Sequence, residues 1–112
     1  MAEPTARTLH ASGLEFSATE WGDPSGPAVL CLHGFPDSPA TFHHQITPLT
    51  DAGYRVITPT LRGYEPSSQP TDGDHTLATL ATDVIGWLDD LGVEHAHLVG
   101  HDWGAAIVTL TA

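Results

Sequence analysis

The sequence AHLVGHDWGAAIV, residues 96–108, decides the fold of this chain. An apolar run predicts a strand over residues 96–99, and a second apolar run predicts a helix over residues 105–110. Between them, Gly100 and Gly104 stand two residues before and two residues after Asp102. A strand, a sharp turn and a helix, with glycines around one reactive residue, form a pattern that is typical of a nucleophile elbow.

The glycines have a physical reason. A turn this tight brings the strand and helix backbones close together, so the flanking positions must be nearly free of side chains. We expect a positive φ at Asp102, which Asp tolerates better than most residues. Its carboxylate is expected at the exposed start of a helix, where the helix dipole favours the ionised form that can act as a nucleophile. The alternative is a simple helix N-cap, a position that Asp also prefers.

Composition excludes several classes of function. The 112 residues carry a net charge of -11, with three arginines and no lysine. A surface of this charge repels phosphate backbones and anionic membranes, so we expect neither nucleic-acid nor membrane partners. Cys31 is the only cysteine and lies in an apolar run, which predicts an inert core thiol. There is no leader-like segment and no stretch long enough to span a bilayer, so a cytoplasmic protein is expected.

The remaining elements alternate. Two short strands around a Ser-Gly turn, residues 8–12 and 14–21, are followed by a continuous apolar strand over residues 28–32. Downstream, the pattern predicts an irregular helix over residues 39–49 that Pro48 limits, a strand over residues 54–58, and a helix over residues 77–91. The helix over residues 77–91 has one apolar stripe, formed by Leu77, Leu80, Ala81, Val84, Ile85, Leu88 and Leu91. This order predicts an α/β fold with a mostly parallel sheet, helices on both faces and antiparallel early strands.

Ligands bind such sheets beyond the carboxyl ends of the strands. The turns that begin at His33 and at Gly100 both follow predicted strands, so they can meet in space. His33-Gly34-Phe35-Pro36, Leu61-Arg62-Gly63-Tyr64 and the elbow at residues 100–104 together resemble the α/β-hydrolase fold. Within that fold they resemble the epoxide hydrolases, with the haloalkane dehalogenases as close cousins. The resemblance covers essentially the whole chain and favours the nucleophile over the simple cap at Asp102.

The resemblance implies a role for each motif residue. Asp102 would be the catalytic nucleophile, forming an alkyl-enzyme ester with an epoxide. The backbone N–H groups of Phe35 and Trp103 would form the oxyanion hole, and both side chains would contact the substrate. The remaining motif residues would shape the loops: His33, Gly34, Pro36, Gly100 and Gly104. The implied partners are a small apolar epoxide and water, with no cofactor and no metal.

Other polar residues receive structural interpretations. His33 is expected to brace its loop, and His101 to project away from the nucleophile. His95 and His97 share a strand face without a third ligand, which disfavours zinc. The His43-His44 pair, Glu65 and Asp74 are expected to be solvated, and Tyr54 and Tyr64 are expected to contact the core and a loop.

Alternatives remain at this point. The Trp103 indole could bind a leaving halide, as in a dehalogenase, although Phe35 cannot donate the side-chain hydrogen bond that many dehalogenases place there. The resemblance also implies a later acid, a late general-base histidine and a helical cap. Residues 1–112 are therefore expected to be a partial domain, cut after the elbow. A second class of interpretation is a non-catalytic truncated product or interaction fragment. The sequence leaves the oligomeric state open.

Overall fold

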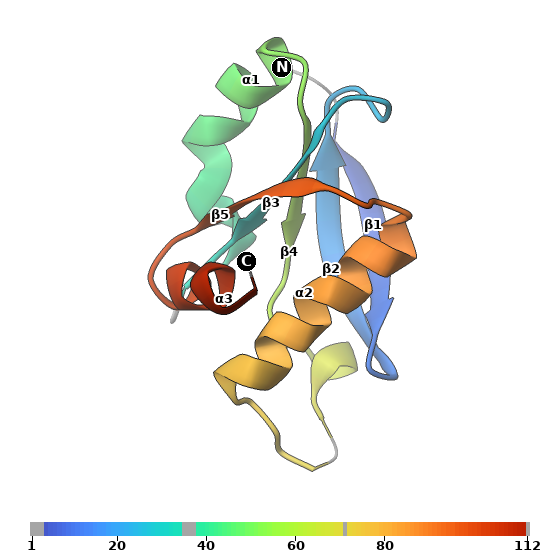
Figure 1. Ribbon diagram of the computed structural model, residues 1–112, viewed down its shortest axis with the longest axis vertical. Helices are drawn as coiled ribbons and strands as arrows, with labels where there is room; N and C mark the ends of the chain where they lie inside the picture. The colour runs from blue at the N-terminus through green and yellow to red at the C-terminus, as the bar shows by residue number, and fades with distance from the viewer. Residues whose placement is uncertain (1–3, 35–37, 71, 112) are drawn as a thin grey trace.

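The computed structural model describes residues 4–34, 38–70 and 72–111. Their strands form one mixed sheet in the order β1-β2-β4-β3-β5. Helices cover both faces of this sheet (Figure 1). The predicted α/β class, with antiparallel strands first and parallel strands after them, is confirmed.

The chain begins with a hairpin. Strands β1 (Thr5–Ala11) and β2 (Leu14–Trp21) pair antiparallel around Ser12 and Gly13, whose φ values are 53° and 76°. Positive φ at both turn residues matches the twist that a two-residue hairpin needs. Strand β1 starts three residues earlier than predicted, because Thr5 already pairs with Glu20 across the hairpin.

Three parallel strands form the other part of the sheet. Strand β3 (Ala28–Leu32) is buried along its whole length between β4 (Arg55–Pro59) and β5 (Ala96–Gly100). Because the strands are parallel, the turns that follow them lie side by side, beyond the carboxyl ends of the strands. Strand β5 ends the strand order and is half exposed, as expected for an edge strand.

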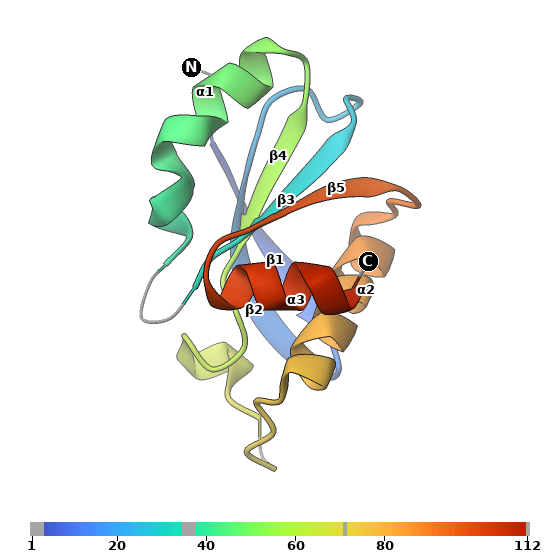
Figure 2. The same ribbon diagram turned by 60° about the vertical axis from the view of Figure 1, so that its left-hand side comes forward.

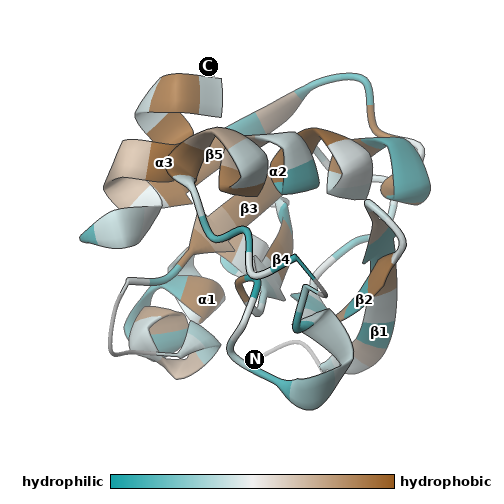
Figure 3. Cartoon of the chain, turned by 90° about the horizontal axis from the view of Figure 1, so that it is seen from below, coloured by the Kyte–Doolittle hydropathy of each residue, from teal (hydrophilic) through white to brown (hydrophobic). Residues whose placement is uncertain are grey.

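The helices divide into two layers. Helix α1 (His43–Asp51), preceded by the 3-10 turn η1 (Pro39–Phe42), covers one face. Helices α2 (Leu77–Leu91) and α3 (Trp103–Thr111) cover the other (Figure 2). Apolar residues line the sheet between the layers, and polar residues lie toward the rim (Figure 3). Among the described helices, none is long and apolar enough to cross a membrane.

Helix α2 follows the predicted pattern closely. The Thr76 hydroxyl accepts the N–H of Thr79 at the start, and Gly92 closes the end with a φ of 70°. Ile85 departs from the prediction, since it is 48% exposed, whereas Trp87 is fully buried and packs edge-on against Phe16. The buried face is therefore rotated toward Trp87, whose large ring fills the space above β2.

Helix α1 runs past Pro48 to Asp51, so the prediction that Pro48 limits the helix is wrong. A proline removes its own N–H donor and crowds the carbonyl four residues earlier, but the residues after it can still donate. The Ala52 N–H closes the helix on the carbonyls of Pro48 and Leu49. Burial of Ile46 under this helix compensates for the missing hydrogen bond.

Cys31 is fully buried in β3. This burial confirms the predicted core position, and it raises the pKa of the thiol to about 11, which disfavours the reactive thiolate.

A buried carboxylate links the hairpin to β4. Arg55 binds Glu20 with two hydrogen bonds of 2.9 and 3.0 Å, and Arg7 forms a further ion pair with Glu20. Burial raises the pKa of Glu20, but the hydrogen bond and charge of Arg55, together with Arg7, outweigh it and hold the pKa below its usual value.

Acid is therefore expected to destabilise the fold through Glu20. A carboxylate whose pKa is lower in the folded state stabilises the fold, and this contribution is complete above the unfolded pKa of about 4.3. The contribution is lost as the pH falls from there through the folded pKa. The measurement is the thermal unfolding midpoint between pH 7 and pH 3, for the parent and for Glu20→Gln. The variant should be less stable at pH 7 and should lose less on acidification. Equal acid slopes in both proteins would contradict the assignment to Glu20.

Candidate functional site

The turn between β5 and α3 has the geometry of a nucleophile elbow. Asp102 has a φ of 57°, is exposed, and immediately precedes the first residue of α3. Its backbone carbonyl accepts the N–H of Ala105 at 3.0 Å, which starts the helix. The predicted positive φ is confirmed, and the β-region backbone of an ordinary N-cap is not adopted.

The two elbow glycines are required by close backbone contacts. A Cβ atom at Gly100 would overlap the backbone of Gly104, and a Cβ atom at Gly104 would overlap the carbonyl of Leu32 at the end of β3. The His101 N–H also donates to the Leu32 carbonyl at 3.1 Å. The elbow is therefore pressed directly onto the end of the neighbouring strand.

The loop after β3 begins against the Asp102 side chain. A Cβ atom at Gly34 would lie 2.5 Å from Asp102 Cβ and 2.9 Å from Asp102 Oδ2. Only a glycine lets this backbone approach the carboxylate so closely. The structure thus brings Gly34 and Asp102 together, as the sequence predicts. Phe35 and Pro36, predicted for the oxyanion hole and for shaping the loop, lie outside the described residues.

His33 is a buried brace between two loops. Its Nδ1 lies 3.0 Å from the Gly34 carbonyl, and its Nε2 accepts the Leu61 N–H at 3.0 Å. A backbone N–H can only donate and a carbonyl can only accept, so the contacts assign the proton to Nδ1. The prediction that His33 braces its loop is confirmed. Because both ring nitrogens are engaged with the backbone, His33 is poorly placed to act as a base.

A cavity of about 500 Å³ opens beside the elbow. The loop after β4 supplies one wall, with Tyr64 stacked edge-on against His33 at 4.8 Å between ring centroids. Trp103 supplies another wall and is 46% exposed. The lining is mostly apolar and consists of Leu61, Arg62, Gly63, Tyr64, His75, Leu80 and Trp103. Such a cavity can take a small apolar molecule.

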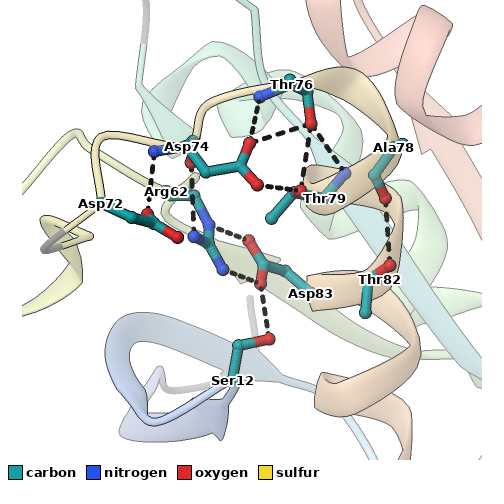
Figure 4. A network of polar contacts seen from close by, with 9 residues as sticks. All are labelled: Ser12, Arg62, Asp72, Asp74, Thr76, Ala78, Thr79, Thr82 and Asp83. Carbon is teal, nitrogen blue, oxygen red and sulfur yellow. Dashed lines mark hydrogen bonds and ion pairs between the residues drawn. The ribbon is translucent and has the colours of Figure 1, made fainter.

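A buried ion pair anchors the loop after β4 to helix α2. Arg62 donates to both carboxylate oxygens of Asp83 at 2.7 Å, and both side chains are nearly inaccessible to solvent (Figure 4). The hydrogen bonds that Arg62 donates to Asp83 raise the pKa of the guanidinium. This ion pair was not predicted from the sequence. Two features of the sequence indicate it, since Asp83 interrupts the apolar face of α2 and Arg62 is one of only three arginines in a chain without lysine.

Several other predictions can be compared with the contacts. Asp74 is not merely solvated, because it accepts hydrogen bonds from Thr76 and Thr79. The backbone hydrogen bond of Thr76, followed by the Thr79 hydroxyl, lowers the pKa of Asp74. Glu65 likewise accepts the Ser17 N–H at 2.5 Å, which ties its loop to β2.

Of the remaining histidines, His101 belongs to the elbow through its backbone hydrogen bonds, and His75 lines the adjacent cavity. His97 packs against the Tyr54 ring on the face of β5, and the exposed His43 and His44 rings contact each other. Within the described residues there is no group of three histidine, cysteine, aspartate or glutamate side chains able to hold a metal ion.

The arrangement places an exposed carboxylate, the amino end of a helix and a glycine backbone at one point. A carboxylate held in this way can attack an electrophilic carbon. Backbone N–H groups at the helix start can stabilise an oxyanion that develops on it. The adjacent apolar cavity offers space for the electrophile.

Known proteins resemble this chain in sequence and in fold. The family model described as alpha/beta hydrolase fold matches residues 27–112. Epoxide hydrolase A from Mycobacterium tuberculosis is 43% identical over 109 residues, which covers 96% of this chain and 34% of that protein. An epoxide hydrolase from Caballeronia sordidicola is 47% identical over 98 residues, covering 87% and 29%.

Solved structures extend the comparison. The crystal structure of epoxide hydrolase A from Mycobacterium thermoresistibile superimposes with a TM-score of 0.89 at 39% identity, over 97% of this chain and 34% of that one. The epoxide hydrolase VrEH1 from Vigna radiata gives 0.87 at 39% identity, over 96% and 35%. The chain thus spans about a third of the length of these relatives.

Proposed function

Because this chain belongs to the α/β-hydrolase fold family, we propose that it carries the nucleophilic half of an epoxide hydrolase site, with Asp102 as the nucleophile. The single observation that carries the proposal is the Gly34 backbone against the carboxylate of an Asp102 held at positive φ. Relatives that are named epoxide hydrolases and align through the elbow support the choice of epoxides.

The first chemical step forms an ester. An oxygen of the Asp102 carboxylate attacks an epoxide carbon, the ring C–O bond breaks, and the alkoxide takes a proton from water. The product is a hydroxyalkyl ester of Asp102. The half-exposed Trp103 indole and the cavity beside it would hold the apolar part of the substrate.

The second step returns the carboxylate. Water adds to the carboxyl carbon of Asp102 and gives a proton to the hydroxide left by the first step. The negative charge that develops on the carboxyl oxygen is stabilised by the N–H groups of Trp103 and Phe35. Each such donor typically contributes roughly 3 kcal/mol to lowering the barrier. Collapse of the intermediate releases the diol, and one oxygen of water stays in Asp102.

We propose further that residues 1–112 by themselves react once and then stall. A base that deprotonates the attacking water typically contributes ~10²–10⁴-fold. Both nitrogens of the buried His33 are held by Gly34 and Leu61, which leaves this nearby histidine unsuited to the task. The ester of Asp102 is therefore expected to accumulate.

The test uses styrene oxide as a probe. Incubation of the purified chain should increase its intact mass by one epoxide, with the label located on Asp102 by peptide mapping. After removal of the epoxide in water enriched in heavy oxygen, slow decay of the adduct should leave one heavy oxygen in Asp102. A diol formed without an adduct and without label in Asp102 would exclude the covalent mechanism.

The same assay separates the nearest alternative. Trp103 is exposed enough for its indole N–H to bind a leaving halide, which favours a dehalogenase as the second candidate. Incubation with 1-chlorobutane should give little adduct if the site is built for epoxides. An adduct with the chloroalkane at a comparable rate would assign the site to halide displacement.

A further inference from the structure

We propose that His75 is a specificity-determining residue of the cavity beside Asp102, and that it selects epoxides whose far end carries a hydroxyl group. The imidazole Nε2 of His75 accepts the hydrogen bond of that hydroxyl. The inference rests on the proposed function, since it concerns the substrate that Asp102 attacks. It narrows that function from apolar epoxides in general to one chemical class.

His75 lies on the wall of the cavity that Trp103 also lines. Trp103 directly follows Asp102 in the chain, so this cavity adjoins the reacting carboxylate. A substrate whose epoxide carbon meets Asp102 extends the rest of its structure past the indole into the cavity. Because the lining is mostly apolar, a polar group on the wall decides which far ends fit well.

The segment that carries His75 is held in place by hydrogen bonds on both sides. The Asp74 carboxylate accepts the Thr76 N–H at 3.0 Å and the Thr79 hydroxyl at 2.7 Å (Figure 4). The Arg62 guanidinium donates to the Asp74 carbonyl at 3.3 Å. A side chain on such a segment loses less freedom when it binds a ligand, so its contacts contribute more to selectivity.

The two ring nitrogens of His75 have different surroundings. Nδ1 lies 3.0 Å from the Gly73 carbonyl, which can only accept, so this contact assigns the proton to Nδ1. In the neutral ring Nε2 is then an acceptor, and no other described residue forms a hydrogen bond with it. Nε2 lies beside Gly63, which also lines the cavity, and a Cβ atom added there would be 2.6 Å away. The structure therefore presents an acceptor at the cavity wall.

An acceptor on an apolar wall favours a ligand that carries a donor. The Arg62 guanidinium on the same wall is already bound by Asp83, and the Trp103 indole can only donate. A hydroxyl at the far end of the substrate pairs with His75 Nε2, whereas an ether in its place leaves this nitrogen without a donor. One hydrogen bond of this kind typically changes the binding constant by ~5-fold.

The experiment compares three epoxides that differ only at the far end: phenyl glycidyl ether and its 4-hydroxy and 4-methoxy derivatives. The rate of adduct formation on Asp102 is measured by intact mass at low probe concentration and about pH 8, where imidazole side chains are generally neutral. The parent should react ~5-fold faster with the hydroxy probe than with the methoxy probe. Because the readout is this ratio, a change in overall reactivity cancels.

Two substitutions separate the two nitrogens. His75→Asn keeps an amide donor for the Gly73 carbonyl but is too short to place an acceptor where Nε2 lies, so the ratio should fall to near unity. His75→Gln reaches that position with its carbonyl oxygen and should recover most of the ratio. The control is His95→Asn, which changes an exposed histidine at the opposite end of β5 from the elbow and should keep the parental ratio.

Three outcomes would overturn the proposal: a parental ratio near unity, an unchanged ratio in His75→Asn, or an equal fall in His75→Asn and His75→Gln. Nitrogen-15 NMR of the imidazole gives a readout that needs no epoxide. Addition of 4-methoxyphenol should shift the Nε2 signal of His75, while 1,4-dimethoxybenzene should leave it in place, and equal shifts would also overturn the proposal. A parent that forms no adduct with any of the three epoxides refutes the proposed function instead, and the NMR titration then decides the role of His75.

Discussion

Replacing Asp102 with alanine is expected to abolish formation of the covalent adduct with styrene oxide. The variant has no carboxylate to attack the epoxide carbon, and loss of a nucleophile typically costs on the order of 10⁶-fold in rate. Intact-mass measurement over a time course reports the effect directly. Because Asp102 is exposed at the start of α3, the substitution removes little packing. Alanine in this left-handed backbone costs about 1 kcal/mol, so the variant should stay folded with a modestly lower thermal unfolding midpoint.

A matched control and a second variant sharpen this expectation. Asp89→Ala removes another exposed carboxylate, near the end of α2, and should label like the parent. Asp102→Asn should also form no adduct, since the neutral amide of asparagine is a poor nucleophile. Full labelling of Asp102→Ala would place the nucleophile elsewhere and refute the proposed role of the elbow.

Replacing Gly104 with alanine is expected to cause the largest loss of stability among glycine-to-alanine substitutions in this chain. The added Cβ would overlap the Leu32 carbonyl and would lie 2.9 Å from the His33 carbonyl. Both neighbours are backbone atoms of the central strand and its turn, so they cannot move aside independently. Overpacking of this kind costs about 3 kcal/mol in free energy of unfolding, and it would also separate the elbow from Gly34.

The control is Gly92→Ala. Gly92 has a φ of 70° with no atom near the position of a new Cβ, so its cost is confined to the left-handed backbone of the helix end, about 1 kcal/mol. Chemical denaturation of both variants gives the comparison. If Gly104→Ala loses no more stability than Gly92→Ala, the close contact between the elbow and β3 is not a determinant of the fold.

Local patterns in the sequence determined most of the elements. The continuous apolar run gave β3 its bounds, Ala28–Leu32, and the three-and-four spacing located α2 with Thr76 and Gly92 at its ends. The glycines around Asp102 predicted its positive φ. These features depend on backbone conformations and periodicities within a few residues, which a single sequence displays directly. Where this local reasoning failed, at Pro48 and Ile85, packing in the folded chain decided the outcome.

Tertiary structure alone decided which polar side chains meet. The pairing of Arg62 with Asp83, the hydrogen bond from Leu61 to His33, and that from the His10 N–H to Asp90 join residues 21, 28 and 80 positions apart. Asp90 stands in the last turn of α2, where the helix dipole disfavours an anion. The hydrogen bond that it accepts from His10 in β1 explains why an aspartate is found there. Such contacts arise only after the strand order β1-β2-β4-β3-β5 has set the turns side by side. The sequence by itself therefore determined the strands, the helices and the reactive turn. The fold determined the contacts around that turn, because the distance between side chains depends on how the whole sheet is assembled.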